Sequence, residues 1–341
     1  MFIPLDEAPW NLRPPTSQIS PNDWAVLARY WYPVAVDGDV KQAPVKGKLL
    51  DVDIVIYRVE DQVAVALDVC PHRHIRLSAG RIVDDRLVCP FHGLAFNAAG
   101  MCTNVPALGR QVKLPATYHL YKVRSAARYG LIWACLDEDS GEQIPDFPAG
   151  DEAGLDRLAF GIVRDWPISA ARQVEGFTDI AHLPFIHPSA IGGDPNAILA
   201  PALVEATKVG FVMRAQYLET PEGLEPMLKK MTYRITMPFM IDFETQTVDE
   251  PTPDIRMINF PAPITAHECR VFSVFVLDGP SPSRESQPGP GDLVNSEDIE
   301  LVKHLARPDL PLNQKWEIHI PLDNNSVEYR KRLRELGLGR R

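Results

Sequence analysis

The sequence lacks the features that would place the protein at a membrane or on a nucleic acid. No stretch approaches the apolar length that a membrane-spanning helix needs. The opening residues contain early acidic side chains and no long apolar run, so they lack the pattern of a signal peptide. The formal net charge of −10 provides no basic face for general phosphate binding. We therefore expect a cytoplasmic protein with no membrane and no nucleic-acid partner.

Cysteine is also scarce, with five in 341 residues. Cys102, Cys135 and Cys269 belong to no motif, and we expect them to be buried, reduced thiols. Proline is abundant, with 32 residues, and favours short strands and loops over long helices. The length of the chain leaves room for two domains with cores of their own.

The other two cysteines belong to a compact four-ligand pattern. Cys70 and His72 form C-x-H, and Cys89 and His92 form C-x-x-H, with sixteen residues between His72 and Cys89. Proline and glycine beside these pairs indicate tight turns. The set could hold zinc in a closed tetrahedral site, or a Rieske [2Fe–2S] cluster, which takes one Cys and one His from each loop. Zinc fingers place both cysteines first and both histidines second, so the order here favours the cluster.

The residue pattern divides the chain into an arm with a short helix (1–44), a small all-β domain (45–137), an acidic linker rich in Gly and Pro (138–156), and a larger domain (157–341). The arm's helix is predicted from Asn22 or Asp23, as N-cap, to about Arg29. In the larger domain we expect a helix over 170–186, a loop over 278–292 and a helix capped by residues 295–297 that runs to about Leu305. We expect a basic, solvated helix over 328–341. Alternating apolar residues predict antiparallel strands at 211–218, 232–244, 256–260 and 268–277.

A second constellation lies inside the predicted helix at 170–186. Asp179 and His182 are three residues apart and would share one helix face. His187 is five residues beyond His182, about 140° around a regular helix, but Pro184 would kink the chain and could return His187 to the side of His182. Two histidines and a carboxylate suggest a 2-His-1-carboxylate iron site. Two ordinary polar histidines near a helix end are the alternative.

The two motifs in this order resemble the terminal oxygenase (alpha) subunits of Rieske non-haem iron oxygenases, most of all the vanillate demethylase and dicamba monooxygenase group. The resemblance implies an α+β fold, with an N-terminal all-β Rieske domain and a helix-grip-like catalytic domain in which helices flank an antiparallel sheet. It implies a [2Fe–2S] cluster on Cys70, His72, Cys89 and His92, and mononuclear Fe(II) on His182, His187 and a downstream carboxylate. For that carboxylate Asp298 is favoured over Glu297 and Asp292.

The resemblance also gives Asp179 a role between two metal centres. In such enzymes this Asp bridges the iron-ligand histidine, here His182, to a cluster histidine of the neighbouring subunit, here His92. This arrangement implies a head-to-tail homotrimer. The family often has Asn four residues before this Asp, where this chain has Glu175, and whether Glu175 approaches the iron stays open.

The expected activity needs a source of electrons. The chain has no dinucleotide fingerprint, so a separate NAD(P)H-dependent reductase, a ferredoxin, or both must supply them. The resemblance implies hydroxylation or oxidative demethylation of a small aromatic compound with O₂. A ring cis-dioxygenase acting on an aromatic acid, and a Rieske electron-transfer protein without oxygenase activity, are the alternatives. Weaker expectations concern the pocket lining: Phe185, Ile186, Phe239, Ile241, Phe243, Phe260 and Phe272.

Overall fold

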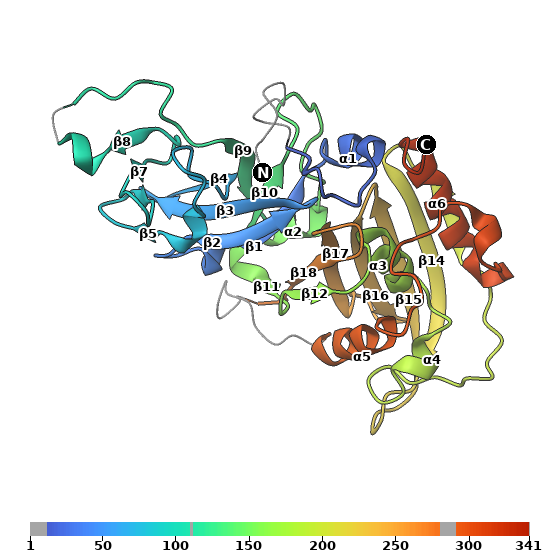
Figure 1. The fold of residues 1–341 in the computed structure, drawn as a ribbon. Coiled ribbons are helices and arrows are strands. Elements are labelled where there is room, and N and C mark those ends of the chain that lie inside the picture. The colour runs from blue at the N-terminus through green and yellow to red at the C-terminus, as the bar shows by residue number, and fades with distance from the viewer. Residues whose placement is uncertain (1–11, 110–111, 280–290, 341) are drawn as a thin grey trace.

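The computed structural model describes residues 12–109, 112–279 and 291–340. Two β-rich halves lie end to end, with helices gathered around the C-terminal half (Figure 1). The predicted α+β fold is therefore confirmed, whereas the boundaries proposed for the domains stay a prediction. In the described part of the chain, no helix combines the length and the apolar character that crossing a membrane requires.

The N-terminal half is built on a six-stranded antiparallel sheet with a small four-stranded sheet beside it. In spatial order the large sheet contains β1 (Tyr32–Val36), β10 (Leu131–Cys135), β9 (Lys122–Arg128), β4 (Gln62–Leu67), β3 (Val52–Val59) and β2 (Val45–Leu49). The small sheet contains β5 (Arg81–Ile82), β6 (Leu87–Val88), β7 (Ala95–Phe96) and β8 (Cys102–Asn104). A separate apolar core fills the space between them and includes Tyr57, Leu77, Leu87 and Phe96. This core supports the two loops that carry the C-x-H and C-x-x-H motifs.

The C-terminal half is built on an eight-stranded antiparallel sheet. Its order is β11 (Leu158–Phe160), β18 (Cys269–Val276), β17 (Ile255–Pro263), β16 (Met240–Thr247), β15 (Met227–Thr236), β14 (Gly210–Glu219) and β13 (Leu203–Ala206), and β12 (Arg164–Trp166) also pairs with β18. The helices are α1 (Pro21–Leu27), α2 (Pro148–Ala153), α3 (Ala170–Phe177), α4 (Leu183–Ile186), α5 (Asp292–Val302) and α6 (Asn324–Glu335). In Figure 1, α3 crosses one face of the sheet, with α4 and α5 at its lower end and α6 beside β14.

One continuous core joins the two halves. The ring of Phe260 on β17 meets Trp133 of β10 edge to face, with centroids 5.2 Å apart, and Tyr32 of β1 at 6.2 Å. Backbone hydrogen bonds continue the junction, because the amides of Leu50 and Asp51 donate to the carbonyls at 263 and 264. Buried aromatic contacts of this kind give the interface the character of a domain interior.

Three predicted helix or strand boundaries and the predicted exposure of one helix are wrong. Helix α1 begins at Pro21 and its N-cap is Ser20, whose hydroxyl accepts from the amide of Asp23 at 3.1 Å. The strand predicted over 232–244 is a hairpin of β15 and β16 that turns at 237–239. Helix α5 begins at Asp292, so residues 295–297 lie inside it. The C-terminal helix is packed rather than solvated, since Tyr329, Arg330 and Leu333 are buried. The predicted loop over 278–292 falls largely outside the described residues.

Candidate metal centres

The chain between α3 and α4 brings the second motif into position without a continuous helix. Helix α3 ends at Phe177, residues 178–182 are non-helical, and α4 begins at Leu183. Asp179 Oδ1 accepts from the amide of Ala181 at 2.8 Å, which closes the turn between the helices. Pro184 occupies the second position of α4, where a missing N–H costs little. The prediction that Asp179 and His182 share one helix face is therefore wrong. The chain changes direction at the turn over 178–182, and not at a kink caused by Pro184.

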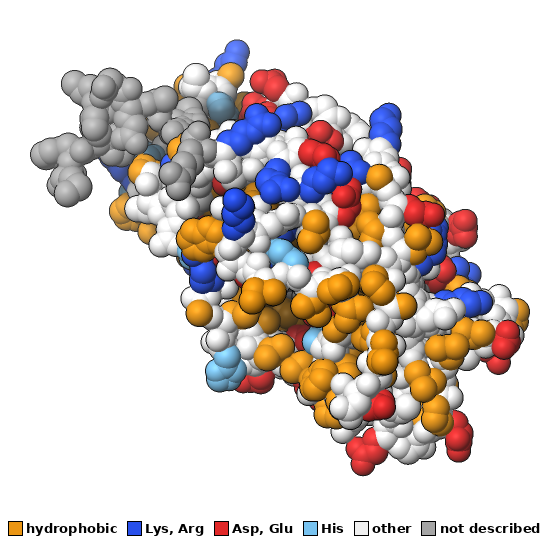
Figure 2. Space-filling model, turned by 90° about the vertical axis from the view of Figure 1, so that its right-hand side faces the viewer, with side chains coloured by type: hydrophobic (Ala, Val, Ile, Leu, Met, Phe, Trp, Pro, Cys, Tyr) orange, Lys and Arg blue, Asp and Glu red, His pale blue; other side chains and the backbone are white. Residues whose placement is uncertain are grey.

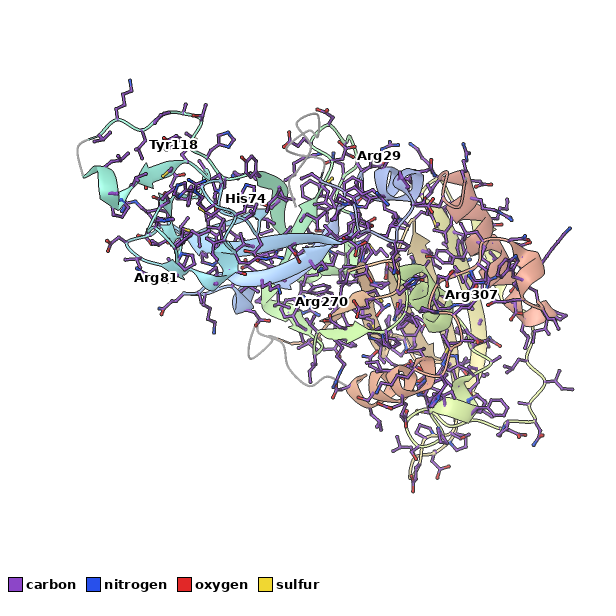
Figure 3. All side chains as sticks on the ribbon, in the orientation of Figure 1. Arg29, His74, Arg81, Tyr118, Arg270 and Arg307 are labelled. Carbon is purple, nitrogen blue, oxygen red and sulfur yellow. The ribbon has the colours of Figure 1, made fainter. Side chains whose placement is uncertain are left out.

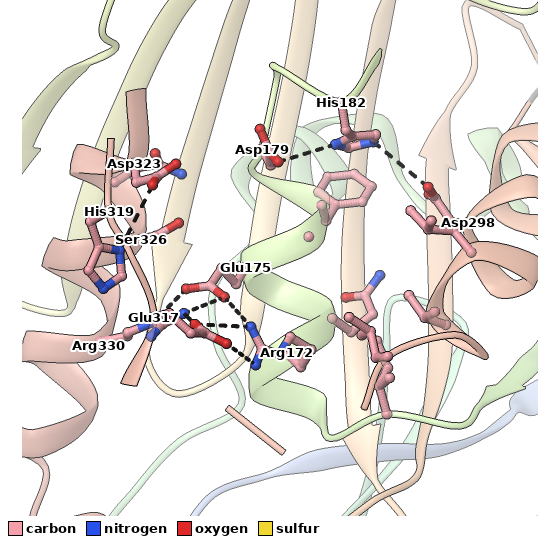
Figure 4. A pocket seen from close by; sticks show the side chains of 18 of the residues that line it. Arg172, Glu175, Asp179, His182, Asp298, Glu317, His319, Asp323, Ser326 and Arg330 are labelled. Atoms are coloured by element: carbon pink, nitrogen blue, oxygen red, sulfur yellow. Dashed lines mark hydrogen bonds and ion pairs between the residues drawn. The ribbon is translucent and has the colours of Figure 1, made fainter. Parts of the chain in front are cut away.

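His182, His187 and Asp298 converge on one point. One nitrogen or oxygen atom from each lies within 4.8 Å of the other two, and in the described ranges this is the only such group of His, Cys, Asp and Glu. Nε2 of His187 lies 3.1 Å from Oδ1 of Asp298, and Nε2 of His182 lies 3.7 Å from the same oxygen. Asp298 comes from α5, which lies beside α4 at the end of the sheet (Figure 1), and Figure 4 shows its carboxylate facing His182.

The opposite ring nitrogens face two further carboxylates. Nδ1 of His187 donates to Oε2 of Glu297 at 2.8 Å, and Nδ1 of His182 lies 3.7 Å from Oδ2 of Asp179. Nε2 of His187 is buried, and its 3.1 Å contact with Asp298 lacks the geometry of a hydrogen bond. Burial lowers the pKa of His187, but Asp298 and Glu297 raise it by more, and the net shift is upward. Two Nε2 atoms and one carboxylate on one side of a point fit a mononuclear Fe(II) ion.

The alternative carboxylates are engaged elsewhere. Asp292 accepts from Arg164 at 2.6 Å. Glu175, nearly buried on α3, binds Arg330 through both of its oxygens at 2.7 and 2.9 Å (Figure 4). Arg172 completes this contact at 3.0 Å. Glu175 therefore holds α6 against α3 rather than contributing to the convergent group.

A cavity of about 320 Å³ opens beside the convergent group. Its walls are mostly apolar, which suits a small ring compound. It is lined by His182, His187, Asp298, Phe177, Leu183, Ala190, Ile191, Glu219, Met231, Tyr233, Phe243, Thr245, Ile255, Met257, Ser273, Phe275, Gly291, Val294 and Asn295. Of the seven side chains predicted to line the pocket only Phe243 does so, and Phe185 is 63% exposed on the outer side of α4.

The two loops of the first motif have the same backbone geometry. The amide of Cys70 donates to the carbonyl of Ile75 and that of Cys89 to the carbonyl of Leu94, both at 2.9 Å. In each loop the residue four after the cysteine donates back to the cysteine carbonyl. That residue is left-handed in both, with φ of 55° at His74 and 72° at Gly93. Glycine meets this requirement without strain.

The four side chains of this motif lie as a cluster requires. Both thiols are buried and both imidazoles, whose ring centroids are 4.6 Å apart, are exposed. Burial raises the pKa of the Cys70 thiol to about 11, so a cationic centre is needed to hold the thiolate. A single zinc ion would bring all four ligand atoms to within roughly 4 Å of one another. Among the described residues these four do not form such a group within 4.8 Å, so they do not match a single zinc ion.

Known families match both halves of the chain. The Rieske [2Fe–2S] domain matches residues 30–121, and the vanillate O-demethylase oxygenase C-terminal domain matches residues 169–338. The chain belongs to the Rieske non-haem iron oxygenases. This oxygenase therefore uses a [2Fe–2S] cluster and mononuclear iron, takes its electrons from reductase or ferredoxin partners, and is a monooxygenase of the demethylase type.

Individual relatives extend this likeness over most of the oxygenase. It is 29% identical to methylxanthine N1-demethylase NdmA of Pseudomonas putida over 321 residues, which are 91% of this chain and 89% of the relative. The NdmA QL mutant with theobromine superimposes with a TM-score of 0.75, at 27% identity over 92% of each chain. Dicamba monooxygenase bound to dicamba shares the fold, with a TM-score of 0.70 at 21% identity over 91% of this chain and 97% of the other.

Sequence reasoning found every member of the convergent group but not the roles of two neighbours. Glu297 was an alternative ligand, whereas its carboxylate binds the far nitrogen of His187. Its position beside Asp298 on a helix was the available signal, because adjacent helical residues point in different directions. Glu219 enters the cavity from a strand 37 residues beyond His182, and no motif in the sequence marks it.

Proposed function

We propose that this oxygenase removes a methyl group, as formaldehyde, from a small N-methylated ring compound. The observation that carries the proposal is the position of His182, His187 and Asp298 at the wall of a cavity of ring-compound size. The likeness to an N-demethylase over nine-tenths of the chain supports N-methyl rather than O-methyl substrates. The balanced reaction consumes O₂, two electrons and two protons, and yields the N–H product, formaldehyde and water.

The metal ligands follow from which atoms converge. We assign Nε2 of His182, Nε2 of His187 and the carboxylate of Asp298 to the iron, and Cys70, His72, Cys89 and His92 to the cluster. The iron supplies O₂ activation, and ligands on one face leave the remaining positions free. Glu297 fixes the ring of His187 through Nδ1. Phe177, Tyr233 and Phe243 pack against one another at the cavity wall and exclude water from the methyl group.

Electron delivery is the reason to propose a homotrimer. The cluster loops lie in the N-terminal half, where Figure 3 labels His74 and Arg81, whereas α4 and α5 lie at the far side of the C-terminal half (Figures 1 and 3). A neighbouring subunit placed head to tail would bring its His92 to Asp179, whose half-exposed carboxylate lies beside His182. We therefore propose that Asp179 carries electrons from the neighbouring cluster to the iron.

The surfaces that such a ring would join are both apolar. Leu301, Leu305 and Ile318 are exposed and line the opening at Asp179, and apolar side chains gather on this end of the molecule (Figure 2). Beside the cluster histidines, Phe91 is 59% exposed and Ile75 is 38% exposed. Burying these patches against each other would remove apolar surface from water at both ends.

Product analysis tests the activity. The loaded enzyme is supplied with a surrogate reductase and offered caffeine, theobromine and N-methylated anilines, while formaldehyde and the demethylated product are quantified. We expect equal amounts of the two products, and we expect His182→Ala to abolish both while its cluster still accepts electrons. Ring-hydroxylated product without formaldehyde would overturn the proposal.

A further inference from the structure

One charged side chain in the cavity has no part in the proposed metal centre. Glu219 is the last residue of β14 and pairs with Met227 in the register with β15. The same register sets Ala215 opposite Met231, so Glu219 lies on the face of the sheet that carries Met231 and Tyr233. Glu219 therefore enters the cavity from the sheet, while the metal-centre residues enter from the connections and helices that cover it.

The carboxylate of Glu219 has no partner among the described residues. Lys229, whose charge acts on Glu219, is buried and binds Oδ2 of Asp254 at 3.1 Å and Oγ1 of Thr247 at 2.8 Å. Glu219, Lys229 and Asp254 together carry one net negative charge. Burial raises the pKa of Glu219, Lys229 lowers it and Asp254 raises it, with a net upward shift. A half-buried carboxylate without a partner is costly, and a ligand that supplies a donor would remove this cost.

Apart from the iron that His182, His187 and Asp298 would hold, the described lining offers no countercharge for an anion. None of the described residues that line the cavity is Lys or Arg, and Thr245, Ser273 and Asn295 are neutral. An aromatic carboxylate would place its charge in an apolar cavity that already contains Glu219. Such a substrate would meet repulsion and an unpaired buried charge.

We infer that Glu219 binds an N–H or ammonium group of the substrate and makes the enzyme selective for neutral or cationic N-methylated rings over aromatic acids. This inference rests on the proposed demethylation at the same cavity, since it identifies the substrate class of that site. It also argues against an aromatic acid as the substrate. Recognition by a positioned acceptor discriminates more sharply than apolar fit, because the wrong ligand leaves the acceptor unpaired.

Three ring compounds that differ in one group test the inference by binding. Dissociation constants are measured by calorimetry for 4-(dimethylamino)benzylamine, the corresponding benzamide and the corresponding benzoate, which carry the same N-methyl groups. We expect the amine and the amide to bind at least tenfold more tightly than the benzoate. In Glu219→Gln we expect the amine to lose about tenfold in affinity and the benzoate to gain, so that the preference collapses.

Two controls keep the outcome specific. Glu222→Gln changes an exposed carboxylate three residues away, and should leave the three constants unchanged. An unfolding temperature for Glu219→Gln that is no lower than that of the parent protein shows that the fold is intact. An unchanged amine-to-benzoate ratio in Glu219→Gln, or tightest binding of the benzoate by the parent protein, would overturn the inference. Absence of formaldehyde from bound amine or amide would instead count against the proposed demethylation and leave the binding result standing.

Discussion

At the scale of single residues, each histidine of the candidate iron site faces two carboxylates. Nε2 of both rings points toward Asp298, while Nδ1 of His187 is bound by Glu297 and Nδ1 of His182 faces Asp179. A carboxylate on the far nitrogen fixes the tautomer and makes the imidazole a better ligand. Glu297 is hydrogen-bonded to His187 and orients its ring. Asp179 lies farther from His182 and stays available to a second subunit.

Glu297→Gln should weaken iron binding without unfolding the protein. The amide can still contact Nδ1 but no longer supplies the negative charge, so we expect iron affinity to fall by about tenfold to a hundredfold. Titration of the iron-free protein with Fe(II) measures the change. Glu300→Gln, an exposed carboxylate on the same helix, is the matched control. Equal iron affinity in the two variants would show that Glu297 does not act through His187.

The residues that the sequence predicted are those that a motif marks. His182 and His187 follow from their spacing behind the first motif, and Asp298 from an acidic pair before an apolar helix. The helical argument for Asp179 and His182 failed because the turn at 178–182 is set by a side-chain hydrogen bond, which periodicity does not detect. Glu219 was beyond prediction because its place in the cavity depends on the pairing of β14 with β15.

At the scale of helices and strands, α6 holds α3, the helix that precedes the turn with His182, in place. Arg330 is 2% exposed and binds Glu175 of α3 and Glu317, and Arg172 contacts the same two carboxylates (Figure 4). Two arginines and two glutamates thus balance in charge, with Arg330 and Glu175 nearly buried and Glu317 partly exposed. The C-terminal segment positions α3, and with it the turn that carries His182.

Arg330→Met should lower the free energy of unfolding by about 3 kcal/mol, because Glu175 is then buried with only Arg172 beside it. Urea unfolding followed by circular dichroism measures the change. Arg334→Met, exposed on the same helix, should shift stability by less than about 0.5 kcal/mol. The double variant Glu175→Met with Arg330→Met should recover part of the loss. Equal effects of the two single arginine variants would contradict this account.

Glu317 should make this ion network sensitive to acid. Burial raises the pKa of Glu317, but Arg172 and Arg330 lower it by more, to below its usual 4.5. A lowered folded-state pKa stabilises the protein above pH 4.5, and this contribution is lost as the pH falls below that value. The stability difference between the parent protein and Glu317→Gln should therefore be constant from pH 7 to pH 5 and shrink toward pH 4. A difference that does not vary with pH would refute the assignment.

Helices and strands, like single residues, were predicted where a local sequence pattern marks them. Strands with alternating apolar residues, such as β14 and β18, were predicted within about two residues. The hairpin was not predicted, because its turn at 237–239 reads Met-Pro-Phe and is as apolar as the strands beside it. The buried face of α6 was not predicted either, because it depends on partners far away in the sequence. Within the basic C-terminal segment, Arg330 resembles a solvated charge. In the folded chain it is buried, because Glu175 and Glu317 pair with it.

At the scale of the whole molecule, the proposed ring predicts that two inactive variants restore each other. His187→Ala would lack the iron and His72→Ala would lack a competent cluster, but in a mixed ring the cluster of one chain would serve the iron of the next. For equal co-assembly, each head-to-tail interface pairs the right donor and acceptor in about one case of four. Purification through both tags removes the uniform rings, and a mixed ring of three has one productive interface of three, so we expect about a third of the parent activity from the doubly tagged protein.

The same mixture contains its own control. Adding Asp179→Asn to the His72→Ala chain should abolish the restored activity, because that chain supplies the iron. Adding it to the His187→Ala chain should leave the activity unchanged. Transfer within one chain would give no activity in any mixture.

The spacing of the two candidate centres along the chain implies an order of cofactor loading during synthesis. Cys70 and His92 span 23 residues, and the core beneath them is drawn entirely from residues 55–120. Asp298 follows His182 by 116 residues, after every strand of the large sheet has been made. The N-terminal part of a chain leaves the ribosome and folds first. The four cluster ligands would therefore be in place long before the last residue of the iron site is synthesised. A chain interrupted before α5 should therefore carry the brown colour of the cluster and no iron at the second site.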